Sequence, residues 1–218
     1  MRTIQDIYTE YRIPPNLQLH MYRVAAIGQY IADHLRADVK VDKDLITKVN
    51  LLHDMGNIVK FDFDMYAVMG MSAEDVPYWK NVQTEFIEKY GKDEDIATDA
   101  IIEELEVEKK VLNILGQHGL LKVRYALENN DFDLKIIRIS DSRISPHGVV
   151  TLSHRWSDIR RRYANKNHKL NNIAETNERE SIEHEIENQI QKKCTIDVQK
   201  ITDADIEPYI ETLHDYEI

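Results

Sequence analysis

Cysteine, glycine and proline are scarce in this chain of 218 residues, with 1, 7 and 5 copies. The single cysteine, Cys194, excludes a disulfide framework within the chain and fits a reducing compartment. With few glycines and prolines, the chain has few of the turn residues that connect short strands. Leu, Ile, Glu, Lys and Ala, in contrast, recur at helical spacing. The sequence therefore predicts an all-α fold and a cytoplasmic protein.

Positive charge is also in short supply, because 28 Lys and Arg face 39 Asp and Glu, which gives a net charge of −11. A general basic surface for nucleic acid is not expected on such a chain. An anionic substrate would need local positive charge, such as a metal ion or an Arg/Lys cluster. No apolar run is long enough to span a bilayer, and the N-terminus lacks the apolar region of a secretory signal. We therefore expect no nucleic-acid partner and no membrane.

Apolar residues at spacings of three and four predict successive helices. Asn16 is a candidate N-cap for a helix that runs to about Arg36, and Asp42 is a candidate N-cap for the next helix. Residues 56–77 mix aromatic, Met and Asp residues and are predicted to form a loop or lid. Further helices are expected over 78–90, 94–105, 107–118, 122–129, 132–143, 149–166, 178–193 and 203–214.

The composition changes after about Asn165, where a polar stretch precedes a helix with few apolar residues. Its narrow stripe of Ile182, Ile186 and Ile190 can cover only part of a neighbour. That stripe either packs on the core or meets a second copy of the chain in a homodimer. We predict a main domain over residues 1–165 and a helical C-terminal extension over 166–218 that packs on it.

Several ionisable side chains lie on the apolar faces of these predicted helices, namely His20, His53, His118 and Asp141. A single histidine in such a place is usually hydrogen-bonded within the core. A buried, unpaired carboxylate, however, costs several kcal/mol, roughly, even after relaxation. A divalent cation that accepts imidazole nitrogen and carboxylate oxygen together would resolve the cost. Asp54 directly follows His53, and helix neighbours diverge by about 100°, so both reach one ion only near a helix end.

The order of these residues, H…HD…D, occurs in the segments LQLHMYRVA, LLHDMGNIVK and IIRISDSRISPHGVVTLSHR. Together with YGKDEDIATDAIIEEL, these segments resemble the HD domain superfamily of metal-dependent phosphohydrolases, in its small single-domain prokaryotic form, over about residues 16–165. The resemblance implies an all-α helical bundle that holds a metal at its centre. It also implies that the metal ligands are His20, His53, Asp54 and Asp141.

The resemblance further implies a catalytic mechanism. Metal-bound hydroxide would attack a small phosphate ester, with a nucleotide as the first substrate to consider, and Asp54 would orient the water or take its proton. His118 is one clear extra histidine where two-metal members carry more. This favours one divalent ion (Mn, Co, Ni, Fe, Zn or Mg), with His118 lining the site or donating to the phosphate.

The motif departs from the family pattern at Asn57, since many members carry HDxGK and this chain has HDMGN. The cation that binds phosphate must then come from elsewhere. The candidate substrate-binding residues are Arg23, Lys60, Arg143 and His147. Arg143 could equally stabilise the fold. The run RWSDIRRRY is predicted to be a solvated helix face, and its alternative is a local anion patch.

Two other functional classes remain open at this stage. The first is a non-catalytic HD-fold module that binds a nucleotide or a protein partner and keeps the metal as a structural element. The second is nucleic-acid processing, which the acidic charge and the lack of a partner domain disfavour. Intact ligand positions favour the enzyme, and the change at Asn57 mildly favours an altered function.

Overall fold

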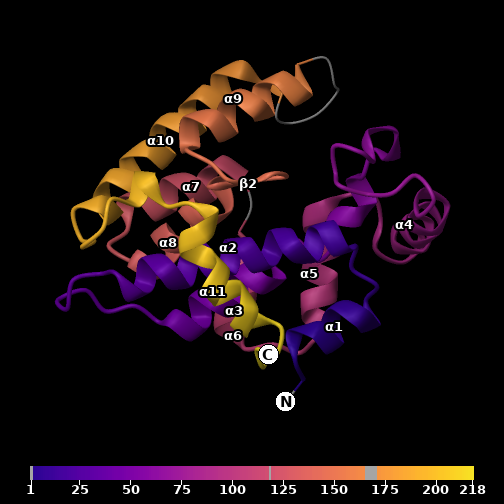
Figure 1. The fold of residues 1–218 in the computed structure, drawn as a ribbon, viewed down its shortest axis with the longest axis horizontal. Coiled ribbons are helices and arrows are strands. Elements are labelled where there is room, and N and C mark those ends of the chain that lie inside the picture. Colours follow the sequence, from indigo (N-terminus) through magenta and orange to yellow (C-terminus); the bar gives the residue numbers. More distant parts are fainter. Residues whose placement is uncertain (1, 118, 165–170) are drawn as a thin grey trace.

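Residues 2–117, 119–164 and 171–218 are described in a computed structural model, and they form eleven α-helices with one two-stranded sheet (Figure 1). The α-helices are α1 (Ile4–Glu10), α2 (Pro15–Asp33), α3 (Lys43–Leu52), α4 (Val76–Tyr90), α5 (Glu94–Glu104), α6 (Lys109–Leu115), α7 (Gly119–Glu128), α8 (Phe132–Ser142), α9 (Leu152–Tyr163), α10 (Ile173–Gln191) and α11 (Asp203–Leu213). Short 3-10 helices are η1 (Asn57–Lys60), η2 (Phe63–Met65) and η4 (Val198–Lys200), and the strands are β1 (Ile144–Ser145) and β2 (Gly148–Val149). The all-α prediction is confirmed.

The helix starts agree with the capping rules, with one correction. The Asp42 carboxylate accepts a hydrogen bond from the Leu45 backbone N–H at 3.0 Å, so Asp42 caps α3 as expected. The prediction that Asn16 caps α2 is wrong, because α2 already begins at Pro15, with Pro14 at the N-cap. A proline at the first helical position has its φ preset and no N–H to satisfy, so no side-chain cap is needed there.

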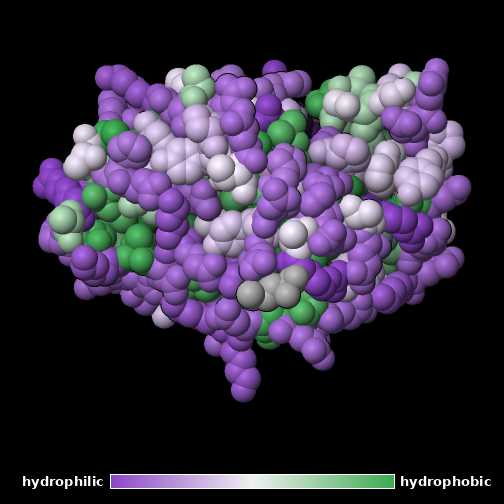
Figure 2. Space-filling model, turned by 60° about the horizontal axis from the view of Figure 1, so that its bottom comes forward, coloured by the Kyte–Doolittle hydropathy of each residue, from purple (hydrophilic) through white to green (hydrophobic). Residues whose placement is uncertain are grey.

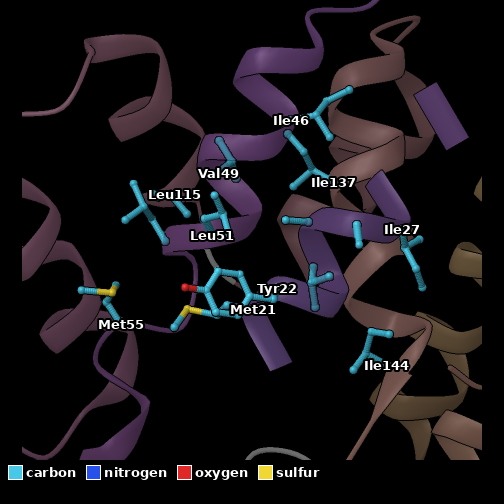
Figure 3. Packing of buried hydrophobic residues seen from close by; sticks show 14 of the residues in the cluster. Met21, Tyr22, Ile27, Ile46, Val49, Leu51, Met55, Leu115, Ile137 and Ile144 are labelled. Carbon is cyan, nitrogen blue, oxygen red and sulfur yellow. The ribbon is translucent and has the colours of Figure 1, made fainter. Parts of the chain in front are cut away.

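Helix α2 lies at the centre of the fold, where it packs against α3, α8 and α11. Figure 3 shows Met21 and Ile27 of α2 among Ile46 and Val49 of α3. The approach is close at Gly28, where an added Cβ would lie 2.6 Å from Nδ2 of Asn50. Glycine at this position therefore lets α2 and α3 pack closely, which brings the helices carrying His20 and His53 together.

The C-terminal helices pack on the rest of the chain. Helix α10 contacts α7, α8 and α9, and α11 contacts α2 (Figure 1). Ile186 and Ile190 are fully buried against this core, and Ile182 is partly buried. Cys194 is buried as well. The isoleucine stripe therefore meets this chain's own core, while the domain boundary near residue 165 stays a prediction.

Two elements were not predicted from the sequence, namely α1 and the β1–β2 hairpin. In the hairpin, Ile144 pairs with Val149 and Ser145 with Gly148 in antiparallel register. Gly148 has a φ of 127°, which side-chain-bearing residues rarely adopt. The helix expected from residue 149 therefore begins only at α9, where the Thr151 hydroxyl accepts from the His154 backbone N–H.

The irregular segment is confirmed over residues 56–75, which contain only η1, η2 and turns, whereas residues 76 and 77 already belong to α4. The Gln83 side chain of α4 holds it by donating to the carbonyls of Ile58 and Phe61, both at 2.9 Å. Asp62 and Asp64 are exposed. This segment is therefore tied to α4 just beyond the HD pair.

One face of the molecule is mostly hydrophilic, and its hydrophobic residues form separate patches (Figure 2). Large apolar side chains that remain exposed are spread along the chain: Leu19, Val68, Tyr78, Ile96, Tyr125 and Ile173. No helix in the described part of the chain is both long and apolar enough to cross a membrane. The homodimer stays a prediction.

Candidate metal centre

Two helices and one turn carry the first three predicted ligands. His20 lies within α2, while α3 ends at Leu52, so that His53 is its C-cap and Asp54 follows in the turn. This position at a helix end is the one that adjacent ligands require. The turn is fixed to α5, because the Gly56 N–H donates to the Thr98 hydroxyl at 3.0 Å. A Cβ at residue 56 would lie 2.4 Å from the Thr98 backbone nitrogen, so only glycine fits there.

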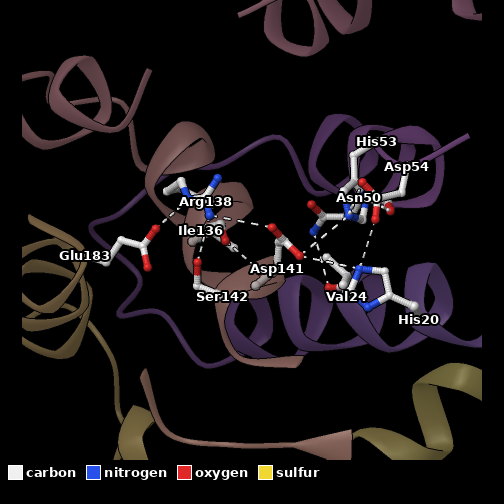
Figure 4. Close-up of polar contacts among 11 residues, drawn as sticks. His20, Val24, Asn50, His53, Asp54, Ile136, Arg138, Asp141, Ser142 and Glu183 are labelled. Carbon is white, nitrogen blue, oxygen red and sulfur yellow. Dashed lines mark hydrogen bonds and ion pairs between the residues drawn. The ribbon is translucent and has the colours of Figure 1, made fainter. Parts of the chain in front are cut away.

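The four predicted ligands face one another, as Figure 4 shows. Nε2 of His20 lies 3.4 Å from Oδ2 of Asp54 and 3.4 Å from Oδ1 of Asp141. Nε2 of His53 lies 3.6 Å from Oδ1 of Asp54 and 3.7 Å from Oδ1 of Asp141. The ligand atoms of His20, His53 and Asp54 all lie within 4.8 Å of one another. Such nitrogen and oxygen donors around one point suit a divalent transition metal.

The tautomer of His53 supports this interpretation. Its Nδ1 lies 2.8 Å from the Asn50 carbonyl oxygen, which can only accept a hydrogen bond. Nδ1 therefore carries the proton, and in the neutral ring Nε2 carries the lone pair. Nε2 is buried and has no hydrogen-bond partner among the described residues. A ring held by a carbonyl through one nitrogen, with the other nitrogen free, is the usual state of a histidine ligand.

The electrostatics of the site keep the Asp141 carboxylate charged. Burial alone would lower the pKa of His53, but the charges of Asp54 and Asp141 and the hydrogen bond to the Asn50 carbonyl raise it above the ordinary value. Burial alone would raise the pKa of Asp141, whereas the facing imidazoles of His20 and His53 and the charge of Arg138 hold it well below the usual range. The Asp141 carboxylate is thus ionised and able to ligate a cation.

A second layer holds Asp141, and sequence analysis missed it. Nη2 of Arg138 lies 3.5 Å from Oδ2 of Asp141 and donates to the Ser142 hydroxyl at 2.8 Å. Nε of Arg138 donates to the fully buried Glu183 of α10 at 3.0 Å, and the Trp156 indole donates to the same carboxylate at 2.7 Å. The sequence signal that could have identified Glu183 was its position beside the apolar stripe of α10. Glu183 therefore links the C-terminal extension to a predicted ligand.

The prediction that Arg143 binds substrate or acts in catalysis is wrong. Its side chain is only 1% exposed, and Nη1 donates to Glu187 at 3.0 Å and to the Val198 carbonyl at 2.6 Å. The guanidinium also donates to the carbonyl oxygens of Val150, Gln199 and Ile201. Arg143 therefore anchors the extension and has no surface left for a substrate.

The other predicted substrate-binding residues have partners away from the predicted ligands or are exposed. Arg23 is 3.9 Å from Asp203, and Lys60 is 3.6 Å from Glu94. His147 is exposed in the turn of the hairpin. No hydrogen bond or ion pair joins these three side chains to a predicted ligand within the described ranges. Their roles stay predictions, and His118 lies outside the described residues.

Comparison with known families supports the geometry. A family model of the HD domain matches residues 18–144, which is more than half of the chain. The matched range contains His20, His53, Asp54 and Asp141 and ends before α9 and α10. No curated protein and no solved structure matches the chain significantly. The four facing side chains and the matched range together place this chain in the HD domain family.

Proposed function

We propose that this protein is a metal-dependent phosphohydrolase that cleaves a small phosphate ester, with nucleotides as the first substrates to test. The observation that carries the proposal is the free Nε2 of His53, which faces two carboxylates and a second imidazole. The HD domain family consists in general of metal-dependent hydrolases, and His20, His53, Asp54 and Asp141 are the residues that would hold the ion.

A divalent ion in this position would supply Lewis acidity for a phosphoryl oxygen and would lower the pKa of a water bound to it. The protein contributes orientation. The Asn50 carbonyl fixes the His53 ring, and Arg138 fixes the carboxylate of Asp141. The Asp54 side chain is 23% exposed, so one of its oxygens can hold the attacking water and accept its proton.

The substrate's phosphate needs a cation that the HD motif does not provide. Asn57 stands where many family members carry lysine, and it is buried and uncharged. Arg23 and Lys60 are the sequence-predicted replacements. Each lies at the long end of ion-pair range from its present carboxylate partner, at 3.9 and 3.6 Å, so either could turn toward an anion.

The first test is metal content by elemental mass spectrometry on purified wild type, Asp54→Ala and Asp64→Ala. Asp64 is an exposed carboxylate just beyond the HD pair and serves as the matched control. We expect about one transition metal per chain in the wild type and in Asp64→Ala, and loss of the metal in Asp54→Ala. A wild type that holds no metal and cannot be loaded with Mn, Co, Ni or Zn would contradict the proposal.

The second test screens phosphate monoesters and diesters with the loaded protein. We expect hydrolysis that Asp54→Ala abolishes while the fold is kept. A protein that holds the metal and hydrolyses no phosphate ester would instead favour the non-catalytic HD-fold module, to which the change at Asn57 also points.

A further inference from the structure

Three cationic side chains near the metal centre have no carboxylate partner among the described residues. They are Lys122 of α7, Arg155 of α9 and Arg179 of α10, and all three are partly buried. In the part of the chain that is described, none of them makes a hydrogen bond or an ion pair, and Nε of Arg179 is fully enclosed. Withdrawing a cation from water without a counter-charge is unfavourable, so the three together call for an anion.

Other arginines of α9 behave differently. Arg160 pairs with Glu180 at 2.6 Å, while Arg161 and Arg162 pair with Asp158 at 2.6 and 2.8 Å. The predicted solvated face of α9 is therefore already neutralised by the protein's own carboxylates. Arg155, on the same helix, lacks such a partner, so a general excess of arginine does not account for it.

The charge of the predicted ligand Asp141 acts on all three cations. Burial and the charge of Arg138 together lower the pKa of Lys122 to about 8, while the charge of Asp141 opposes the shift. Burial also lowers the pKa of Arg155, where the charge of Asp141 opposes it, and of Arg179, where the charges of Glu183, Glu175 and Asp141 oppose it. The charge of Asp54 also raises the pKa of Arg155. All three cations therefore lie near the predicted metal centre.

Packing places them on the side of the site where Arg138 lies. Lys122 and Arg138 line one small cavity of about 10 Å³, which is room for about one water molecule. The Arg179 guanidinium lies 5.6 Å from the centre of the Trp156 ring, whose indole N–H binds the same Glu183 that holds Arg138. Helix α10, which carries Arg179, packs against both α7 and α9, so the three cations come from one wall formed by these helices.

The charge balance indicates what this wall can bind. Glu183 neutralises Arg138, and the carboxylates of Asp54 and Asp141 would neutralise a divalent ion. Lys122, Arg155 and Arg179 then have no ion-pair partner of their own in the part of the chain that is described. A phosphate monoester carries a charge of about −1.5 to −2 near pH 7, and the metal side of the site would take most of it. A second linked phosphoryl group supplies the additional oxygens and charge that three cations need.

We propose that Lys122, Arg155 and Arg179 form an anion subsite beside the metal centre, and that this subsite binds a second phosphoryl group linked to the one that is cleaved. The substrate is then a compound with two or more linked phosphates. The inference deepens the proposed function and rests on it. Arg155 and Arg179 lie beyond residues 18–144, so the segments that follow the family match supply this specificity.

Titration calorimetry with inorganic pyrophosphate and orthophosphate tests the subsite, on the full chain with and without Mn²⁺. The variants are Arg155→Gln and Arg179→Gln, and the control is Arg161→Gln, which removes the same charge from an 80% exposed position of α9. We expect tighter binding of pyrophosphate than of orthophosphate by the wild type. Each of the two variants should weaken pyrophosphate binding by about 10–100-fold, the usual worth of hydrogen bonds to charged groups.

Other outcomes separate the subsite from the proposed function. The subsite is refuted if both phosphates bind equally, or if both variants, shown to be folded by circular dichroism, keep the wild-type affinity for pyrophosphate. Partial recovery of pyrophosphate affinity in Arg155→Lys and Arg179→Lys supports the subsite, because lysine restores the charge without the planar fork of the guanidinium. Arginine-dependent pyrophosphate binding without hydrolysis of any ester would support the subsite and contradict the enzyme. Hydrolysis of a phosphate ester by a protein whose pyrophosphate binding does not depend on the two arginines would support the enzyme and refute the subsite.

Discussion

Two polar clusters in this protein begin only two residues apart in the sequence, at Asp141 and at Arg143, and they differ in completeness. The Arg143 guanidinium is 1% exposed and donates to Glu187 and to carbonyl oxygens of η4 and its neighbours. Asp141 faces His20 and His53 across gaps of 3.4 and 3.7 Å, which exceed a good hydrogen bond. A complete network is structural, whereas an incomplete one leaves room for a ligand.

The comparison also separates two uses of buried charge. All three guanidinium nitrogens of Arg143 have an internal partner, so the C-terminal extension is fixed to the hairpin and α8. Around Asp141 the two imidazoles and two carboxylates converge, and the free Nε2 of His53 remains. Four predictions test this difference, in order of decreasing effect.

Replacing the completed cluster should have the largest effect on stability. In Arg143→Met, Glu187 and several carbonyl oxygens lose their donor in the core, and we expect the free energy of unfolding to fall by roughly 3–5 kcal/mol. Urea denaturation measures the change. Arg161→Gln, at an exposed site, should change stability by less than about 0.5 kcal/mol.

The double variant Arg143→Met/Glu187→Met sharpens that result. It removes both charges, so it should be more stable than Arg143→Met alone, since no unpaired charge remains buried. A double variant as unstable as the sum of two single changes would show that Arg143 acts through packing alone.

The incomplete cluster should respond to metal instead. At a free Mn²⁺ concentration of about 100 times the dissociation constant, we expect the wild type to gain about 2.7 kcal/mol of stability. Asp141→Ala should gain nothing, because a predicted ligand is missing, while Asp64→Ala should behave as the wild type. Thermal unfolding with and without Mn²⁺ measures the gain. Equal gains in Asp141→Ala and the wild type would exclude Asp141 from the ligand set.

Glu183 links α10 to the Asp141 cluster through Arg138. Replacing Glu183 should have an intermediate effect, and the property affected should be metal affinity. In Glu183→Gln, Arg138 loses its counter-charge, so the Asp141 carboxylate is held less firmly. We expect the metal dissociation constant to rise by about 10–100-fold, as is usual for groups that orient ligands. Competition with a chelator measures it, and Glu185→Gln, an exposed change on the same helix, is the control. An unchanged affinity would limit Glu183 to a structural role.

The pH dependence of the metal-free protein should show the smallest effect. The folded-state pKa of His53 is raised, so His53 stabilises the fold below its unfolded value of 6.5 and loses this contribution as pH rises through the folded value. Stability measured by urea should therefore fall above pH 6.5 in the metal-free wild type. The fall should be smaller in His53→Gln and in the metal-loaded protein, where His53 must be unprotonated at Nε2.

Much of the fold could be predicted from local pattern. Apolar spacing located α2 to α11 within a few residues at their ends, because each amphipathic stripe follows the helical period. The hairpin was missed, since its two-residue strands are too short to show a period, and α1 was not predicted. The candidate ligands His20, His53, Asp54 and Asp141 were implied by the resemblance to the HD domain superfamily. The cost of a buried, unpaired carboxylate supported a metal among them.

The sequence by itself determined an acidic, all-helical chain with the HD ligand order, since composition and periodicity act locally along the chain. Only the tertiary structure decided which nearby charges serve the site. Arg143, two residues after Asp141, turns into a structural network, while Arg138 and Glu183, from α8 and the distant α10, meet at Asp141. The physical reason is that packing between helices decides which buried charges become partners. The distance between two residues along the chain does not indicate that packing.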